Sequence, residues 1–167
     1  MKFICFDTET TGVDFNAEIL SLVIVDQDNN VLFNEKFKPI NHESWDDAQA
    51  VYGISPDDVY YCFPITAYAN EIIYIFSQYD YIIGYNISYD FRMLKHDLKL
   101  DFRVGKKIDD VMLMFAPIYG EMGRFNSYKW QKLSKCAEYY KYKFNAHDAL
   151  EDVKATIYCY KKMKGLE

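Results

Sequence analysis

Positive charge is scarce in this sequence, since 19 lysines and arginines against 25 aspartates and glutamates give a formal net charge of −6. A broad basic surface for long duplex DNA is therefore not expected, because such a surface needs many cations along one face. The charge balance does not exclude nucleic acid altogether, because bound divalent cations would offset part of the negative charge.

Long apolar runs and cysteine motifs are also absent. No apolar run approaches the ~20 residues of a membrane-spanning helix, and the amino-terminal residues do not have the pattern of a signal peptide. The four cysteines, at positions 5, 62, 136 and 159, follow neither a zinc-binding nor a redox spacing. We therefore expect a reduced, cytoplasmic protein that does not bind a membrane.

Core-forming residues, in contrast, are plentiful. Half of the residues are hydrophobic and 18% are aromatic, a composition that excludes a disordered chain. The length suits one domain over residues 1–167, with no repeat, linker or low-complexity segment.

Hydrophobic periodicity and turn signals predict an α/β fold. We expect three antiparallel strands first and a further, parallel strand later, at residues 2–6, 17–26, 31–37 and 81–84. Helices are expected near residues 48–52, from Pro56, and at 64–77, 85–98, 108–117, 130–140 and 148–163, with a loop at 118–128. This order predicts a mixed sheet with helices on its faces.

Two carboxylates, Asp7 and Glu9, follow the first expected strand. Side chains alternate between the faces of a strand, so residues i and i+2 point the same way. Adjacent carboxylates repel each other, and a fold holds them best with a cation or a shared proton between them. Oxygen ligands of this kind suit Mg²⁺, although a polar turn with both acids in water is the simpler explanation for this motif alone.

Three further polar residues stand where they suit this pair. Asp90 begins the helix after the strand at 81–84, and functional groups gather beyond the carboxyl ends of strands in α/β sheets. Asp152 lies on the last helix, and His147 precedes it by five residues. Positions i and i+5 differ by about 140° on a helix, so His147 reaches the same site only from the incoming loop. Taken singly, these residues also fit helix caps or solvated surface positions.

The motifs DxET, YNxSYD and HxAxxD therefore occur in this order, at residues 7–10, 85–90 and 147–152. Together they closely resemble the DEDDh, or DnaQ-like, family of 3′-to-5′ exonucleases, which have an RNase H-like fold. The resemblance covers nearly the whole chain. In a related subclass a tyrosine stands four residues before the last aspartate; here that position is Asp148, so the histidine subclass fits better.

The resemblance implies two Mg²⁺ or Mn²⁺ ions held by four carboxylates, those of Asp7, Glu9, Asp90 and Asp152. It also implies that His147 takes the proton of an attacking water, so that nucleoside 5′-monophosphates are released from single-stranded 3′ ends. DNA is the expected substrate, in proofreading or repair. The alternative is a ribonuclease that trims RNA ends or short oligoribonucleotides.

Substrate contacts are implied for Thr10, Thr11, Gly12, Tyr85 and Asn86, although a plain turn explains residues 10–12 equally well. The chain departs from the family at Tyr85, where histidine is frequent, and at Tyr89, where phenylalanine is frequent. Its substrate contacts are therefore expected to differ while the metal ligands stay intact.

For the other candidate substrate contacts, a structural role is an alternative to the functional one. Phe15 and Tyr85 are candidates to stack on the last base, and a core position is the more ordinary role for each. Candidates for phosphate contacts, each also at home on a solvated face, are Arg92, Lys107, Arg124 and Lys129.

A hypothesis from another class is a nuclease-like interaction module, such as a polymerase-associated subunit or a homodimer. Loss of a ligand would favour it. Since all five catalytic-type residues are present, we expect an active enzyme whose partner is the 3′ end of a single strand.

Overall fold

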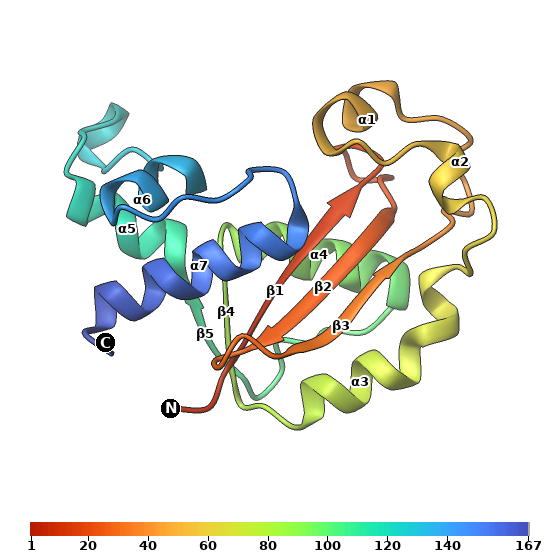
Figure 1. The fold of residues 1–167 in the computed structure, drawn as a ribbon, viewed down its shortest axis with the longest axis horizontal. Coiled ribbons are helices and arrows are strands. Elements are labelled where there is room, and N and C mark those ends of the chain that lie inside the picture. The colour runs from red at the N-terminus through yellow and green to blue at the C-terminus, as the bar shows by residue number, and fades with distance from the viewer. Residues whose placement is uncertain (167) are drawn as a thin grey trace.

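The computed structural model describes residues 1–166, and its centre is one mixed sheet with the strand order β3-β2-β1-β4-β5 (Figure 1). The first three strands are antiparallel neighbours, whereas β4 runs parallel to β1, and β5 runs parallel to β4. This confirms the predicted fold class. The strands are β1 (Ile4–Thr10), β2 (Ile19–Asp26), β3 (Val31–Lys36), β4 (Tyr81–Gly84) and β5 (Lys107–Asp110).

The first strand is longer than predicted. It continues through both carboxylates to Thr10, because its ladder with β2 continues past them and pairs Asp7 with Val23 and Glu9 with Ser21. The two acids therefore lie within the strand and not after it. Their shared face is consequently imposed by the pleat of a paired strand.

The fifth strand was missed, because residues 108–110 were assigned to a helix. Four residues are too few for a period to distinguish strand from helix, and the pairing of Ile108 with Ile82 makes the segment a strand. Asp110 ends β5 and caps α5 (Val111–Tyr119), since its carboxylate accepts hydrogen bonds from the backbone N–H groups of Met112 and Leu113.

The remaining helices follow the predicted order, and the local stop and start signals act as expected. Gly53 ends α1 in the left-handed region at φ 72°, and Ser55 caps α2 with Pro56 at its first position. The helix expected from Trp130 begins only at Leu133. These elements are α1 (Asp46–Tyr52), α2 (Pro56–Val59), a 3₁₀ turn (Ile65–Tyr68), α3 (Ala69–Ser77), α4 (Ile87–Leu98), a second 3₁₀ turn (Arg124–Asn126), α6 (Leu133–Tyr139) and α7 (Ala149–Lys164).

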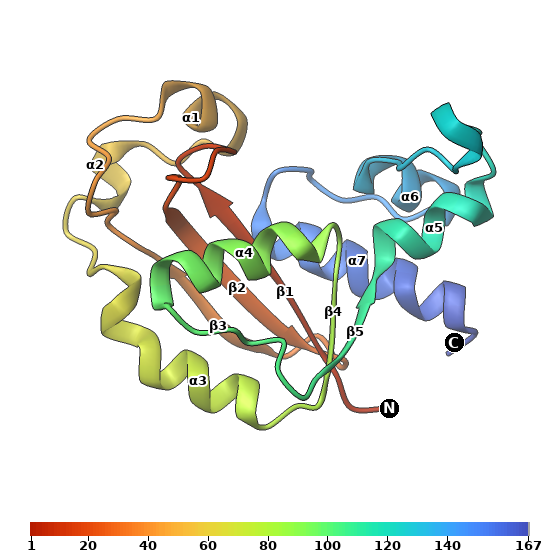
Figure 2. The same cartoon turned by 180° about the vertical axis from the view of Figure 1, so that it is seen from behind.

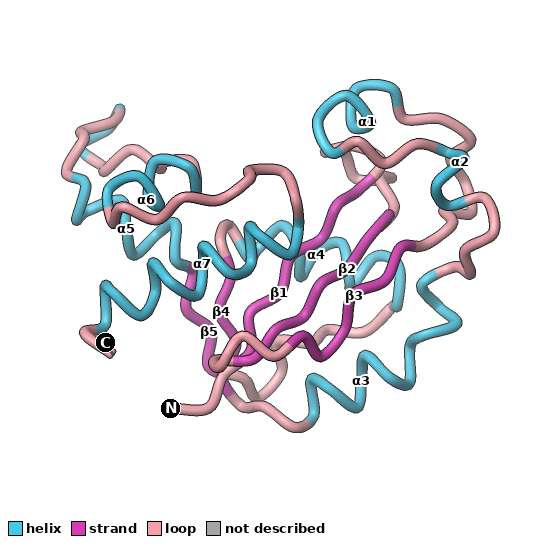
Figure 3. Tube along the Cα trace, in the orientation of Figure 1, coloured by secondary structure: helices cyan, strands magenta, loops and turns pink. Residues whose placement is uncertain are grey.

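Helices cover both faces of the sheet (Figures 2 and 3). Ile4 and Phe6 of β1 join a buried cluster with α3 and α4, whereas Phe3 and Cys5 pack with α7 on the opposite face. By alternation, Asp7 and Glu9 share the face of Cys5, which is the face that α7 covers. Across residues 1–166, no helix combines the length and the apolar character that crossing a membrane requires.

Candidate active site

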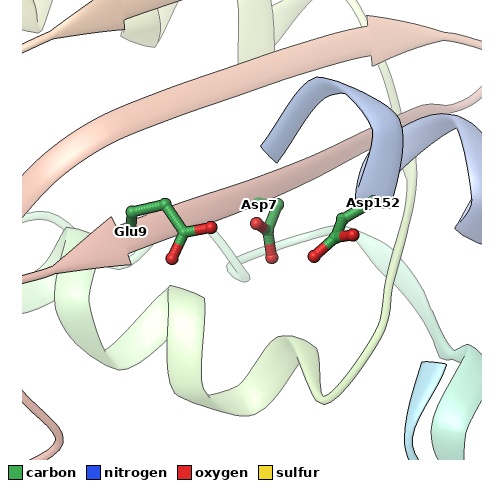
Figure 4. A group of neighbouring side chains, drawn as sticks. All are labelled: Asp7, Glu9 and Asp152. Carbon is green, nitrogen blue, oxygen red and sulfur yellow. The ribbon is translucent and has the colours of Figure 1, made fainter. Parts of the chain in front are cut away.

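Three of the predicted carboxylates converge. Asp7 and Glu9 project from β1, and Asp152 projects from the first turn of α7, with one oxygen of each lying within 4.8 Å of the others. Figure 4 shows Asp7 between the other two, with the three carboxylates turned toward a common space. Residues 145 positions apart in the chain thus share one site, because α7 packs across β1.

The start of α7 determines where Asp152 lies. The Asp148 carboxylate caps the helix by accepting hydrogen bonds from the N–H groups of Leu150 (3.1 Å) and Glu151 (3.2 Å). The first turn then closes with a bond from Asp152 N to Asp148 O at 2.8 Å. Asp152 is therefore held one turn inside the helix, above the strand that carries the other two acids.

Asp90 lies beside these acids but outside the 4.8 Å group. Its buried carboxylate accepts hydrogen bonds from Thr8 N (3.0 Å) and Thr8 Oγ1 (2.6 Å). The parallel pairing of β1 with β4 covers only Ile4 and Cys5, so Thr8 N–H has no strand partner on that side and is free to bind α4. Asp90 as a metal ligand stays a prediction.

Burial and mutual repulsion raise the pKa values of the cluster. Burial, with the charges of Asp90, Glu9 and Asp152, holds the pKa of Asp7 well above its ordinary value. Burial and the charges of Asp152 and Asp90 raise the pKa of Glu9 to about 9. Burial likewise raises the pKa of Asp152 to about 6, and that of Asp90 to about 7 against the opposing hydrogen bonds of Thr8.

Lysine and arginine do not balance the charge of this cluster within residues 1–166. In the part of the chain that the structure describes, no lysine or arginine pairs with any of these four carboxylates. Asp152 Oδ1 is buried and has no hydrogen-bond partner. Closely spaced carboxylate oxygens, of which Asp152 Oδ1 lacks a hydrogen-bond partner, are the donor set that hard divalent cations such as Mg²⁺ and Mn²⁺ prefer, so the residues fit such ions.

His147 lies at the rim of this cluster. It precedes α7 in a turn with φ 71°, and its side chain is exposed. It lines two hollows, one of about 410 Å³ shared with Glu9 and one of about 480 Å³ shared with Asp152. His147 therefore lies on the loop that enters α7 and not within the helix, and its catalytic role stays a prediction.

Tyr52 is a site residue that the sequence analysis did not assign. Its ring lies 6.5 Å from that of His147 in an edge-on arrangement, and it lines the hollow that contains Glu9. Burial, and then the charge of Glu9, raise the pKa of Tyr52 to about 12. The sequence feature that could have identified Tyr52 is the helix stop at Gly53, which places Tyr52 at the end of α1, facing the site.

The loop after β1 is held mainly by its own threonines. The Thr10 side chain is buried, and its hydroxyl contacts the hydroxyl of Tyr89. The hydroxyls of Thr10 and Tyr89 each donate to Gly12 O at 2.7 Å. Thr11 Oγ1 accepts a hydrogen bond from Glu18 N at 3.0 Å. Thr11 and Gly12 line a hollow of about 550 Å³ against α1. Thr10 therefore shapes the loop, and Thr11 and Gly12 face the space beside it.

The two aromatic candidates for base stacking, Tyr85 and Phe15, lie in different surroundings. Tyr85 is half-buried and donates its hydroxyl proton to Gln131 O at 2.8 Å, whereas Asn86 is exposed at the start of α4. Phe15 is 79% exposed and lies 5.3 Å from the guanidinium carbon of Arg92. A core position is therefore wrong for Phe15, because its loop lies at the surface beyond the end of β1.

The cations proposed for phosphate contacts also differ in their surroundings. Arg92 lies over the rings of Phe15 and Tyr89, and Lys107 lies over the ring of Tyr81. Lys129 pairs with Glu121 at 2.8 Å. The remaining candidate, Arg124, is exposed.

Comparisons with known proteins find similar sequences over most of the chain. A family model described as "Exonuclease" (RNase_T) matches residues 4–160. An uncharacterised exonuclease, CP81, of Escherichia phage 186 is 30% identical over 164 residues, which cover 92% of this chain and 84% of the phage protein.

Two similar solved structures are complexes of E. coli exonuclease I. The zinc-bound complex with single-stranded DNA has a TM-score of 0.78 at 21% identity, and covers 99% of this chain and 41% of that one. The complex with a dT13 oligonucleotide has a TM-score of 0.78 at 20% identity, and covers 98% and 41%. The chain thus spans about two fifths of exonuclease I (41%), with which it shares a fold.

Proposed function

Because this chain belongs to the exonuclease family, we propose that it removes nucleotides one at a time from the 3′ ends of single-stranded DNA with the help of divalent cations. Family membership makes it a nuclease, a hydrolase that acts on nucleic acid. The direction, the preference for DNA and the nucleoside 5′-monophosphate product are parts of the proposal.

The observation that carries this proposal is the group formed by Asp7, Glu9 and Asp152 within 4.8 Å. Three carboxylates with no lysine or arginine partner among the described residues are unfavourable by themselves. The arrangement becomes favourable when divalent ions bind, and the resulting site attracts a phosphodiester that the bare carboxylates would repel.

We assign the residues as follows. Asp7, Glu9 and Asp152 would hold the ions, with Asp90 as the fourth ligand. When bound, a pair of such ions lowers the pKa of a water and neutralises charge on the reacting phosphate. His147, at the rim between the two hollows, accepts the proton of the attacking water on a ring nitrogen, since an imidazole can take up a proton near neutral pH.

The substrate preference is supported by the fold neighbours, of which the complexes with single-stranded DNA and dT13 are examples. The terminal nucleoside is proposed to occupy the hollow beside Thr11 and Gly12. A 2′-hydroxyl there would distinguish RNA from DNA. Cleavage of RNA in preference to DNA would move the proposal to the ribonuclease alternative.

The test uses purified protein and single strands of DNA and RNA with the same sequence, labelled at the 5′ end. We expect a ladder that shortens from the 3′ end with Mg²⁺ or Mn²⁺, and no cleavage in chelator. The released product, which carries no label and is detected by its ultraviolet absorbance, is expected to elute with nucleoside 5′-monophosphates in chromatography. The Asp7→Asn variant, which keeps the size of the side chain and removes its charge, is expected to lose the ladder.

Two results would contradict the proposal. Internal cuts, or shortening from the 5′ end, would refute the assigned direction. Equal cleavage by Asp7→Asn and the unmodified protein would show that the acid group is not the catalytic centre.

A further inference from the structure

A groove leads away from the acid group on its Asp152 side. The hollow of about 480 Å³ that contains Asp152 and His147 continues past Tyr85 and Asn86 to Trp130 and Lys132. It lies between the start of α4 and the segment that enters α6. The hollow beside Thr11 and Gly12 has neither Asp152 nor His147 in its lining. With the hollow that contains Glu9, three hollows are therefore described around the acid group, and the proposed function fills the one beside Thr11 and Gly12 with the terminal nucleoside.

The wall of this groove is held in place although its main aromatic is exposed. Trp130 is 64% exposed. The neighbouring Gln131 is buried; its carbonyl accepts the Tyr85 hydroxyl at 2.8 Å, and its side chain donates to Glu121 Oε2 at 3.0 Å. The backbone beside Trp130 is thus fixed at the mouth of the groove while the indole ring faces solvent.

A small hairpin lies next to this segment. Residues 121–129 are closed by a bridge between Met122 and Tyr128 and by the bond from Gly123 N to Ser127 O at 2.8 Å. Its tip presents Phe125, which is 98% exposed and has φ 59°. A bulky residue in the left-handed region is unfavourable, and its position gives it no packing within the described chain.

Cations accompany these aromatic rings. Arg124 adjoins Phe125, and Lys132 follows Trp130 by two residues, and both are exposed. Within residues 1–166, neither forms an ion pair. Alternating aromatic faces and unpaired cations are the surface that single-stranded nucleic acid binds, because bases stack on the rings and phosphates meet the cations.

We propose that this groove, prolonged by the hairpin at residues 121–129, holds the nucleotides on the 5′ side of the bond that is cut. Trp130 stacks on a base, and Lys132 meets a backbone phosphate. The inference rests on the proposed function, since it needs a terminal nucleoside on the other side of the acids. Its occupant is the remaining single strand, and the groove is continuous with the acid group that the strand must reach.

The kinetic test compares a substrate with no upstream strand and substrates of increasing length. The p-nitrophenyl ester of thymidine 5′-monophosphate has one nucleoside, and oligodeoxynucleotides of two to twelve residues add the strand. Trp130→Ala is expected to raise KM for the longest substrate about 5- to 100-fold, and to leave hydrolysis of the ester unchanged. Trp130→Phe, which keeps an aromatic face, is expected to restore much of the loss.

The control is Tyr61→Ala, which removes an aromatic ring that is more exposed (92%) than Trp130 (64%) and lies outside this groove. Its KM for the longest substrate is expected to equal that of the unmodified protein. Unchanged KM in Trp130→Ala would overturn the inference while the proposed function stood. Failure of the unmodified protein to cut any substrate would instead overturn the proposed function.

A binding test works without turnover. The chain has two tryptophans, and Trp45 is buried with its indole N–H donating to Ile54 O at 2.7 Å. Stacking on Trp130 is therefore expected to quench fluorescence when dT12 is added with Mg²⁺ to the His147→Ala protein, which keeps the carboxylates and is expected to cut slowly. A further Trp130→Phe change is expected to remove this quenching. Equal quenching after Trp130→Phe, or none while Trp130 is present, would count against the groove as the binding surface.

Discussion

Two buried glutamates, Glu9 and Glu18, illustrate two uses of a carboxylate in one small fold. They are almost equally buried, at 5% and 6% exposure. Glu18 accepts hydrogen bonds from the backbone N–H groups of Ile40 and Asn41, each at 2.8 Å, and contacts His42 Nδ1 at 2.7 Å. Among the residues that the structure describes, no donor reaches the carboxylate of Glu9, and other acids surround it.

The surroundings give the two groups opposite pKa shifts. Burial would raise the pKa of Glu18, but the hydrogen bonds from His42 and from the backbone of Ile40 and Asn41 lower it below its ordinary value. Burial and neighbouring acids raise the pKa of Glu9 to about 9. Equal burial therefore says little about the role of a carboxylate, whereas its donors distinguish a structural anchor from a ligand site.

The largest expected effect is the difference in kcat/KM between variants of the two glutamates. Glu9→Gln is expected to lower kcat/KM about 10³-fold or more, because bound metal supplies several kcal/mol of transition-state stabilisation. Glu18→Gln is expected to keep kcat/KM within a factor of about 3 at temperatures where it is folded, since a change under 1 kcal/mol corresponds to less than tenfold. Steady-state rates on single-stranded DNA measure both, and a similar loss in the two variants would end the distinction.

The histidines extend the comparison. His147→Ala is expected to lower kcat about 10²- to 10⁴-fold, the range for loss of a general base. The binding of Mn²⁺, measured by calorimetry, should survive because the carboxylates remain. His42→Ala, which removes the partner of Glu18, is expected to leave kcat unchanged. Near-normal turnover of His147→Ala would refute its assignment as the base.

In the absence of metal, Glu9→Gln and Glu18→Gln should shift the melting temperature in opposite directions. The raised pKa of Glu9 means that the folded state binds its proton more tightly than the unfolded state. Its contribution to stability is therefore present at low pH and is lost as the pH rises from about 4.5 toward about 9. In chelator at pH 8, Glu9→Gln is expected to raise Tm by a few degrees, with little change at pH 4.5.

Glu18 has the opposite sign, because its pKa is lowered in the folded state. Its contribution is present above the unfolded pKa and is lost as the pH falls through the folded value. Glu18→Gln removes an acceptor from buried donors, which costs about 1–3 kcal/mol, or about 3–10 °C in Tm for a chain of this size. Thermal scans between pH 3 and 8 measure both variants, and shifts of the same sign would contradict the comparison.

The smallest expected effect concerns the loop that links the two glutamates. Gly12 has no positive φ, and a Cβ there would meet Asp14 Oδ2 at an ordinary 3.6 Å. Gly12→Ala is therefore expected to shift Tm by no more than about 2 °C, while KM rises if the loop approaches the terminal nucleoside. Gly105→Ala, at φ 73°, is the control, and is expected to lose stability without a change in KM. An unchanged KM in Gly12→Ala would remove Gly12 from the substrate contacts.

Much of the fold could be predicted because its signals are local. The stop at Gly53, the cap at Ser55 and the apolar stripe of α3 each depend on residues within a few positions. The strand β5 could not be predicted in this way, because four residues carry no reliable period and pairing with β4 makes them a strand. Phe15 was misplaced for a related reason, since an aromatic side chain does not reveal whether its loop lies at the surface.

By itself, the sequence determined that Asp7 and Glu9 share one face, because alternation is a property of the extended backbone. It also determined a helix that begins just after His147, through the cap at Asp148. Only the tertiary structure decided that Asp152 meets the first two acids, that Asp90 binds Thr8 and that Tyr52 contacts His147. Those meetings depend on how α7, α4 and α1 pack against the sheet, which is a sum over many distant contacts and not a property of any short segment.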